Sequence, residues 1–274
     1  MTLKLGRHTF PDDATLMMAI VNRTPDSFYD QGAFWDLDAF YRRAEQLVLD
    51  GADFLDVGGV KAGPGPEVTE PEELDRVVPA IEALHQRFDV PLSVDTWRAS
   101  VAAACYEVGA VVGNDISGFA DPGYLPAAAR AGASVIATHI RLGPRIPDPE
   151  PVYDDVVQDV ADFLRERAER AEAAGIPPER VIVDAGCDLG KTWQQSLELL
   201  RHSEVLAAMG WPLLLSASNK TFLGKLLDLE VIDRREASHS AHALGILKGC
   251  RILRAHDVKG AKRVVDVLDA LLSA

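Results

Sequence analysis

The chain has 274 residues, of which 47% are hydrophobic, and its mean hydropathy is +0.00. These values are typical of a globular protein with a substantial core, and they exclude a disordered or collagen-like chain. Subtracting 42 Asp and Glu from 28 Lys and Arg gives a formal net charge of −14. Such a chain repels nucleic acid and anionic membranes, so we expect neither as a partner, and an anionic ligand needs a local cluster of basic residues.

The cysteines and the N-terminal segment indicate the compartment. The chain has three cysteines, an odd number, at positions Cys105, Cys187 and Cys250, and none of them forms a C-x-x-C pair. The sequence therefore contains neither a disulfide framework nor a structural zinc motif. Residues 1–13 lack the long apolar stretch of a secretion signal, and no uncharged window reaches the length of about 18 apolar residues that a membrane span needs. We therefore expect a cytoplasmic protein.

The predicted elements begin with a short hairpin over residues 3–10, around Gly6 and Arg7. Eight short apolar runs then alternate with amphipathic segments. The runs cover residues 16–22, 54–59, 91–96, 111–116, 134–140, 181–186, 212–218 and 251–257. Continuous Val, Ile and Leu runs are typical of strands that are buried on both faces of a parallel sheet.

Helical patterns lie between these runs and after the last one. They cover residues 37–50, 72–88, 98–109, 156–174, 192–209, 234–249 and 258–272, and several end at a glycine such as Gly51 or Gly210. Strands that alternate with helices over about 250 residues predict an α/β fold, a single (β/α)8 TIM barrel with a short N-terminal hairpin, as one domain over residues 1–274. A doubly wound open sheet is the alternative, but its Gly-rich turn is missing after the first strand.

In a barrel of this kind the functional groups lie where the C-terminal ends of the strands meet. The C-terminal half of each of the eight runs, or the segment just after it, carries a polar or ionisable residue. These residues are Asn22, Asp56, Asp95, Asn114, His139, Asp184, Ser218 with Asn219 and Lys220, and Arg254 with His256. One such residue alone could equally be a helix cap or a satisfied strand end, but their coincidence at all eight ends predicts a ligand site.

The chemistry of these residues indicates the ligand. Asp95, Asn114 and Asp184 offer carboxylates and an amide to a ring with N–H edges, while three basic residues suit an anion. The basic residues are Lys220, Arg254 and His256. The predicted ligand therefore combines a polar heterocycle with a phosphate.

Three of the rim residues allow a second interpretation. Lys220 could form a Schiff base, as in an aldolase, although no partner acid or base is identifiable from spacing. We expect His139 to pack at the rim, because no second histidine stands at ligand spacing to it. Cys187 fits a packing residue better than a nucleophile.

Six segments in this order resemble those of dihydropteroate synthase. They read NRTPDSF at 22–28, DVGG at 56–59, SVDT at 93–96, NDI at 114–116, DAGCDLGK at 184–191 and RAHDV at 254–258. The resemblance covers about residues 16–270, and its first motif is highly specific. It implies a (β/α)8 barrel that joins a pterin methyl diphosphate to p-aminobenzoate and releases diphosphate, with sulfonamides competing for the second site.

Carried over residue by residue, the resemblance implies an intact pterin pocket and a diphosphate site that lacks one arginine, which Gly63 replaces. The pterin pocket matches Asp95, Asn114, Asp184 and Lys220. The diphosphate site matches Asn22, Arg254 and His256, and Asn22 would also hold Mg2+, which is the implied cofactor.

The second-substrate subsite departs from the family pattern. Val60, Lys61, Ala62 and Gly63 stand where the family has Glu, Ser, Thr and Arg. Asn219 stands beside Ser218 in place of a second arginine, and Leu189 replaces an aromatic residue that faces p-aminobenzoate. We expect this subsite to consist of Ala62, Gly63, Leu189, Ser218 and Asn219, with Lys61 or Arg23 as the compensating charge.

The resemblance therefore implies a transferase of folate biosynthesis that joins 6-hydroxymethyl-7,8-dihydropterin diphosphate to p-aminobenzoate, with turnover that is weak or directed to another arylamine. A non-catalytic pterin-binding paralogue is the alternative. A pterin-dependent methyltransferase is a third candidate, which the NRTPDSF loop disfavours. The resemblance also implies a homodimer through helices of the late half of the barrel.

Overall fold

The structure is a computed structural model that describes residues 2–23, 37–63 and 65–272. Eight parallel strands close into a barrel in the order β10-β3-β4-β5-β6-β7-β8-β9. They are β3 (Leu16–Ile20), β4 (Phe54–Gly58), β5 (Leu92–Asp95), β6 (Val112–Asp115), β7 (Ser134–Thr138), β8 (Val181–Asp184), β9 (Leu213–Leu215) and β10 (Cys250–Ala255). The (β/α)8 barrel predicted from the sequence is confirmed, and each strand lies within the predicted run or within one residue of it.

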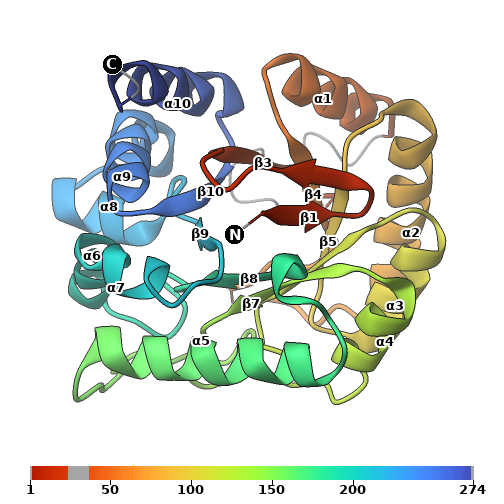
Figure 1. The fold of residues 1–274 in the computed structure, drawn as a ribbon, viewed down its shortest axis with the longest axis horizontal. Coiled ribbons are helices and arrows are strands. Elements are labelled where there is room, and N and C mark those ends of the chain that lie inside the picture. The colour runs from red at the N-terminus through yellow and green to blue at the C-terminus, as the bar shows by residue number, and fades with distance from the viewer. Residues whose placement is uncertain (1, 24–36, 64, 273–274) are drawn as a thin grey trace.

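Helices form an outer ring around this barrel (Figure 1). They are α1 (Leu37–Leu49), α2 (Glu70–Arg87), α3 (Ala99–Glu107), α4 (Tyr124–Ala131), α5 (Val156–Ala173), α6 (Trp193–Arg201), α7 (Ser203–Ala207), α8 (Thr221–Leu227), α9 (Arg235–Leu247) and α10 (Val258–Leu272). Short 3-10 turns occupy Pro178–Arg180 and Val231–Asp233. No helix in the described ranges is both long enough and apolar enough to cross a membrane.

Three details of the helices differ from the sequence prediction. The predicted helix over 192–209 breaks at His202, where the Ser203 hydroxyl donates to the carbonyl oxygens of Leu199 and Leu200. Serine bonds of this kind compete with the helical ladder and bend it. The helices α4 and α8 were not predicted, because segments of eight and seven residues are too short for a clear period.

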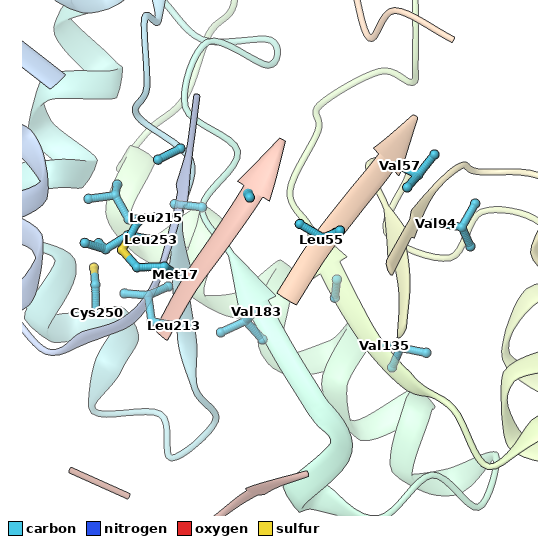
Figure 2. Close-up of a cluster of buried hydrophobic side chains, with 14 of the residues drawn as sticks. Met17, Leu55, Val57, Val94, Val135, Val183, Leu213, Leu215, Cys250 and Leu253 are labelled. Atoms are coloured by element: carbon cyan, nitrogen blue, oxygen red, sulfur yellow. The ribbon is translucent and has the colours of Figure 1, made fainter. Parts of the chain in front are cut away.

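The strands are apolar throughout because both of their faces are buried. On the outer face, Met17, Leu55, Val94 and Val183 pack toward the helices (Figure 2). The inner face forms a separate cluster that includes Met18, Phe54, Val112, Ile136, Ile182, Leu214 and Ile252.

The N-terminal hairpin closes one end of the barrel. It pairs β1 (Leu3–Leu5) with β2 (His8–Phe10) in antiparallel register and lies across the opening in Figure 1. Leu3 and Leu5 are fully buried and belong to the inner cluster. The predicted hairpin is thus confirmed, and it leaves the opposite rim, at the C-terminal strand ends, for the ligand.

Candidate active site

Arg254 links three strand ends at the open rim. From β10, its Nε donates to Oδ2 of Asp56 at 2.8 Å, and its Nη2 donates to Oδ2 of Asp95 at 2.8 Å. Asn114 donates from Nδ2 to the same oxygen of Asp56 at 3.2 Å. Asp95 and Asn114 are partners in the register between β5 and β6, which places their side chains side by side.

Burial shifts the pKa values of Asp95 and Arg254. Burial raises the pKa of Asp95 to about 7, because the attraction of Arg254 does not offset the loss of water and the repulsion of Asp56. Burial also lowers the pKa of Arg254, but the carboxylates of Asp56 and Asp95 outweigh it and hold that pKa above its usual value. One guanidinium therefore serves two carboxylates, and Oδ1 of the wholly buried Asp56 accepts no hydrogen bond within the described structure.

Asp184 ends β8 with its carboxylate held toward the rim. Its Oδ1 accepts from the backbone N–H of Gly186 at 2.8 Å. Gly186 has a φ of +64°, and a Cβ there would lie 2.0 Å from the carbonyl oxygen of His139, so only glycine fits the turn. Burial raises the pKa of Asp184, while the Gly186 N–H and Lys220 oppose the shift.

A two-part cavity opens over these side chains. The inner part, of about 50 Å³, is lined by all four predicted pterin residues, namely Asp95, Asn114, Asp184 and Lys220, together with Arg254. The outer part, of about 340 Å³, is lined by Asn22, Lys61, His256 and the predicted second-substrate residues Ala62, Gly63, Leu189, Ser218 and Asn219. Both parts share Ala62, Asp95, Leu189, Ser216, Lys220 and Arg254, so they form one continuous site.

The predicted site residues therefore all line one cavity, with larger clefts lying elsewhere. A cleft of about 570 Å³ lies beside the N-terminal hairpin, where Arg7 and His8 line it with Pro91 and Leu92 at the start of β5. It is thus at the opposite end of the barrel from the convergent carboxylates. We assign the site by chemistry, because a cluster of buried ionisable groups marks function better than size does.

The space beside Asn22 bears on whether this residue could hold a Mg2+ ion. A Cβ on Gly58 would lie 2.8 Å from Oδ1 of Asn22 and 3.7 Å from Oδ2 of Asp95, so the glycine leaves a small space between an amide oxygen and a carboxylate. The described residues contain no group of three or more His, Cys, Asp or Glu side chains that could hold a metal by themselves. Mg2+ commonly takes one or two protein oxygens and completes its shell with water and phosphate, so Asn22 fits a metal that arrives with a diphosphate.

Arg23 and Lys61 are the two candidates to replace the arginine that is missing at position 63, and the structure places them differently. Arg23 points to α2, where its Nη1 donates to the carbonyl oxygen of Arg76 at 2.8 Å, and it does not line the cavity. Lys61 does line it. The segment 24–28 of the NRTPDSF motif lies outside the described residues.

His256 is held as a neutral imidazole. Its Nδ1 lies 3.0 Å from the hydroxyl oxygen of Ser218, and its backbone N–H donates to that oxygen at 3.2 Å. Burial lowers its pKa to about 3, with further lowering by Arg254, Arg43 and Lys220. In the ligand-free protein, Lys220, Arg254 and Lys61 therefore supply the positive charge around this site, and His256 supplies a hydrogen-bonding group.

The loop after β8 is fastened by a buried lysine. The ammonium of Lys191 lies 2.8 Å from Nδ1 of His139 and donates to the carbonyl oxygens of Gly186 at 2.9 Å and Leu189 at 3.0 Å. Burial lowers the pKa of Lys191 to about 7 and that of His139 to about 3. The His139 ring packs edge-on against Phe163 at 4.7 Å, as expected for a packing histidine.

Cys187 also has the environment of a packing residue. It is 2% exposed, and burial raises the pKa of its thiol to about 12. A thiol in that state is a poor nucleophile.

Sequence reasoning missed the roles of Asp56, Asp188 and Lys191. Asp56 was recognised as a polar strand end, but its bond to Arg254 crosses 198 positions of the sequence. Asp188 has a φ of +68° and reaches α8, which no local pattern reveals. Lys191 is the last residue of the DAGCDLGK motif, but no local sequence pattern shows that its side chain is buried.

Comparisons with known proteins show which family the chain resembles. A family model described as pterin binding enzyme matches residues 18–256. The "inactive dihydropteroate synthase 2" of Mycobacterium leprae is 42% identical over 267 residues, covering 94% of this chain and 91% of that protein. The dihydropteroate synthase of Bacillus subtilis is 38% identical over 273 residues, covering 97% and 93%.

Solved structures show the same likeness. The Yersinia pestis dihydropteroate synthase in complex with a sulfonamide drug has a TM-score of 0.96 and 38% identity, with both chains covered completely. The Xanthomonas albilineans enzyme with 4-aminobenzoic acid has a TM-score of 0.91 and 36% identity, covering 100% of this chain and 98% of that one. With a matching family model, relatives above 35% identity and a shared barrel, this chain belongs to the dihydropteroate synthase family of pterin-binding transferases.

Proposed function

We propose that this chain binds 6-hydroxymethyl-7,8-dihydropterin diphosphate and transfers its pterin methylene group to an arylamine, with only a weak hold on p-aminobenzoate. The observation that carries the proposal is the convergence of Asp95, Asn114, Asp184 and Lys220 on one cavity beside Arg254. The whole chain would act as one pterin-binding domain.

The pterin would lie in the inner part of the cavity. Its ring N–H groups need acceptors, which Asp184, Asp95 and the amide of Asn114 supply, while Lys220 donates to ring acceptors. Buried carboxylates are costly without partners, so a ligand that donates to them gains from their desolvated state.

The diphosphate would lie in the outer part, where Lys61, Lys220, Arg254 and His256 line the wall. Asn22 would hold Mg2+ there together with the phosphate oxygens, and the metal would supply Lewis-acid neutralisation of the leaving group. The basic side chains and the imidazole donate to the same oxygens as negative charge builds on them.

The reaction would exchange one bond for another. The bond between the pterin methylene carbon and the diphosphate oxygen breaks, and the electron pair leaves with the diphosphate. The arylamine nitrogen then bonds to that carbon and loses a proton. The protein contributes by holding the two reactants together and by stabilising the separated charges.

Binding and turnover test this proposal separately. Calorimetry with 6-hydroxymethyl-7,8-dihydropterin diphosphate should show binding that weakens steeply with ionic strength and with EDTA. A diphosphate-release assay with p-aminobenzoate should show slow turnover. Absence of pterin binding contradicts the proposal, and indifference to both salt and EDTA removes the anion site from it.

A non-catalytic pterin-binding protein is the second candidate. It is favoured by the 42% identity to a mycobacterial protein named as inactive and by the shortened side chains at positions 62, 63 and 219. Tight pterin binding with no diphosphate release from any arylamine would establish this candidate instead.

We also propose a cytoplasmic homodimer. Cys105, Cys187 and Cys250 are free and buried, which suits a reducing compartment. Large apolar side chains are exposed on α8 and α9, namely Leu226, Leu227, Leu244 and Leu247, and a partner subunit would cover them. Sedimentation analysis of the protein and of a Leu227→Glu variant tests the dimer, which the substitution should weaken.

A further inference from the structure

Asp188 connects two loops of the rim. It lies between β8 and α6 in the left-handed region, at φ +68°, where aspartate is among the few tolerated side chains. Its backbone N–H donates to the hydroxyl of Ser196 at 3.0 Å. Its carboxylate accepts from the backbone N–H groups of Thr221 and Phe222, the first two residues of α8.

Asp188 belongs to the wall of the outer cavity. It lines that cavity together with Leu189, Asn219 and Thr221, on the side where the second substrate is expected. Within the described ranges it pairs with no lysine, arginine or histidine, and its carboxylate partners are backbone N–H groups. The carboxylate is therefore held in place by backbone donors, and the nearby Lys191 acts on it only through space.

The basic side chains that line the same cavity interact with groups other than Asp188 in the proposed reaction. Arg254 is bonded to Asp56 and Asp95, and Lys220 lines the inner part with the pterin residues. Lys61 is the remaining cation of the outer wall, and a diphosphate that carries several negative charges would attract it. Two positions of the same cavity where the family resemblance implies arginine carry Gly63 and Asn219.

We propose that Asp188 makes the second-substrate subsite select an uncharged arylamine over an arylamine that bears a carboxylate. The inference rests on the proposed function, because it assumes that the outer cavity receives the second substrate. It names the substrate class of that subsite, an aromatic amine without an anionic group.

Two effects of Asp188 act in the same direction. Its charge repels a carboxylate placed in the same cavity, and at the effective dielectric of a protein surface such repulsion lowers affinity by about tenfold. Its carboxylate also satisfies the N–H groups of Thr221 and Phe222, so these donors are not available to an anionic ligand.

The test compares p-aminobenzoate with p-aminobenzamide, which has nearly the same shape and no charge. Dissociation constants for both would be measured by calorimetry in the presence of 6-hydroxymethyl-7,8-dihydropterin, diphosphate and Mg2+. Both would also be measured on the protein alone by ligand-observed NMR. We expect the parent protein to bind the amide about tenfold more tightly than the acid.

Two isosteric substitutions provide the matched comparison. Asp188→Asn keeps an acceptor for α8 and tolerates the left-handed backbone, but it removes the charge. Asp228→Asn makes the same change at an exposed aspartate that also has a positive φ, at the other end of α8 and outside the cavity. We expect Asp188→Asn to tighten p-aminobenzoate by about five- to tenfold and to leave the amide unchanged, whereas Asp228→Asn changes neither.

Several results would overturn the inference. They are a parent protein that prefers the acid, an Asp188→Asn variant that shifts both ligands equally, and a protein that binds neither arylamine in any condition. Failure of the pterin to bind would contradict the proposed function instead. The ratio of the dissociation constants of the two arylamines could then still be measured on the protein alone, so the two failures are distinguishable.

Discussion

The side-chain nitrogen of Lys191 lies 2.8 Å from Nδ1 of His139, in a contact that couples the protonation of the two groups. When Lys191 is protonated it can only donate, so Nδ1 then accepts and the proton of the neutral ring is on Nε2. The other two lysine N–H groups bind the carbonyl oxygens of Gly186 and Leu189. One buried side chain thus ties the loop after β8 to the end of β7.

Replacing this lysine should loosen that loop. Lys191→Met removes the lysine donor from the carbonyl oxygen of Leu189 and the contact with Nδ1 of His139. It leaves the carbonyl oxygen of Gly186 with only the backbone N–H of Leu189 as a donor. We therefore expect the free energy of unfolding to fall by about 2 kcal/mol. Urea denaturation measures the loss. Lys225→Met, at an exposed lysine of α8, should leave the stability within about 0.5 kcal/mol of the parent. Equal stability of the two variants would refute a structural role for Lys191.

The Asp184 carboxylate should be essential for the pterin. We expect Asp184→Ala to weaken binding of the pterin diphosphate by about 2 kcal/mol or more, because the ring loses a buried ionic acceptor. Asp184→Asn keeps an acceptor for the Gly186 N–H and should preserve the fold, yet it still loses the charge. If both variants bind the pterin as the parent does in calorimetry, the pocket is assigned to the wrong residues.

Asp95 should make pterin binding depend on pH. Its pKa is raised to about 7, so it is largely protonated at pH 6 and largely ionised at pH 8. An ionised carboxylate accepts ring N–H groups better, and pterin affinity should therefore rise over this interval. Folding stability should change with pH in the opposite direction. Because the pKa of Asp95 is higher in the folded protein than the ordinary 3.8, its stabilising contribution is fully present below pH 3.8 and is lost as pH rises through 7. Asp95→Asn should flatten the affinity profile, and an unchanged profile would exclude Asp95 as its source.

The sequence predicts the barrel and the rim better than the connections between rim residues. Runs such as 181–186 are readable because a strand buried on both faces needs continuous apolar residues. Asn114 and Asp184 are likewise readable, because a polar residue that ends such a run faces the rim. By contrast, the bond between Arg254 and Asp56 depends on closure of the barrel, and the cap that Asp188 gives to α8 depends on a left-handed residue. Neither leaves a local pattern.

The second-substrate subsite can be tested by restoring side chains. Ala62→Thr, Gly63→Arg and Asn219→Arg together should raise both turnover with p-aminobenzoate and sulfonamide binding. At position 63 a Cβ would meet the Lys61 side chain, at 3.9 Å, and no other residue of the described ranges within 4 Å. Asn219 has a φ of +57°, where asparagine is tolerated and arginine is strained by about 1 kcal/mol, so its single replacement should help least.

The three changes should act non-additively, because they hold one ligand whose amine must lie about 3 to 3.5 Å from the reacting carbon. Steady-state diphosphate release and sulfonamide calorimetry on the single and triple variants measure this directly. A triple variant that folds and binds pterin but gains neither property would show that these loops do not limit p-aminobenzoate. A parent protein that already turns over about once per second, with ordinary sulfonamide inhibition, would show that its second site is intact.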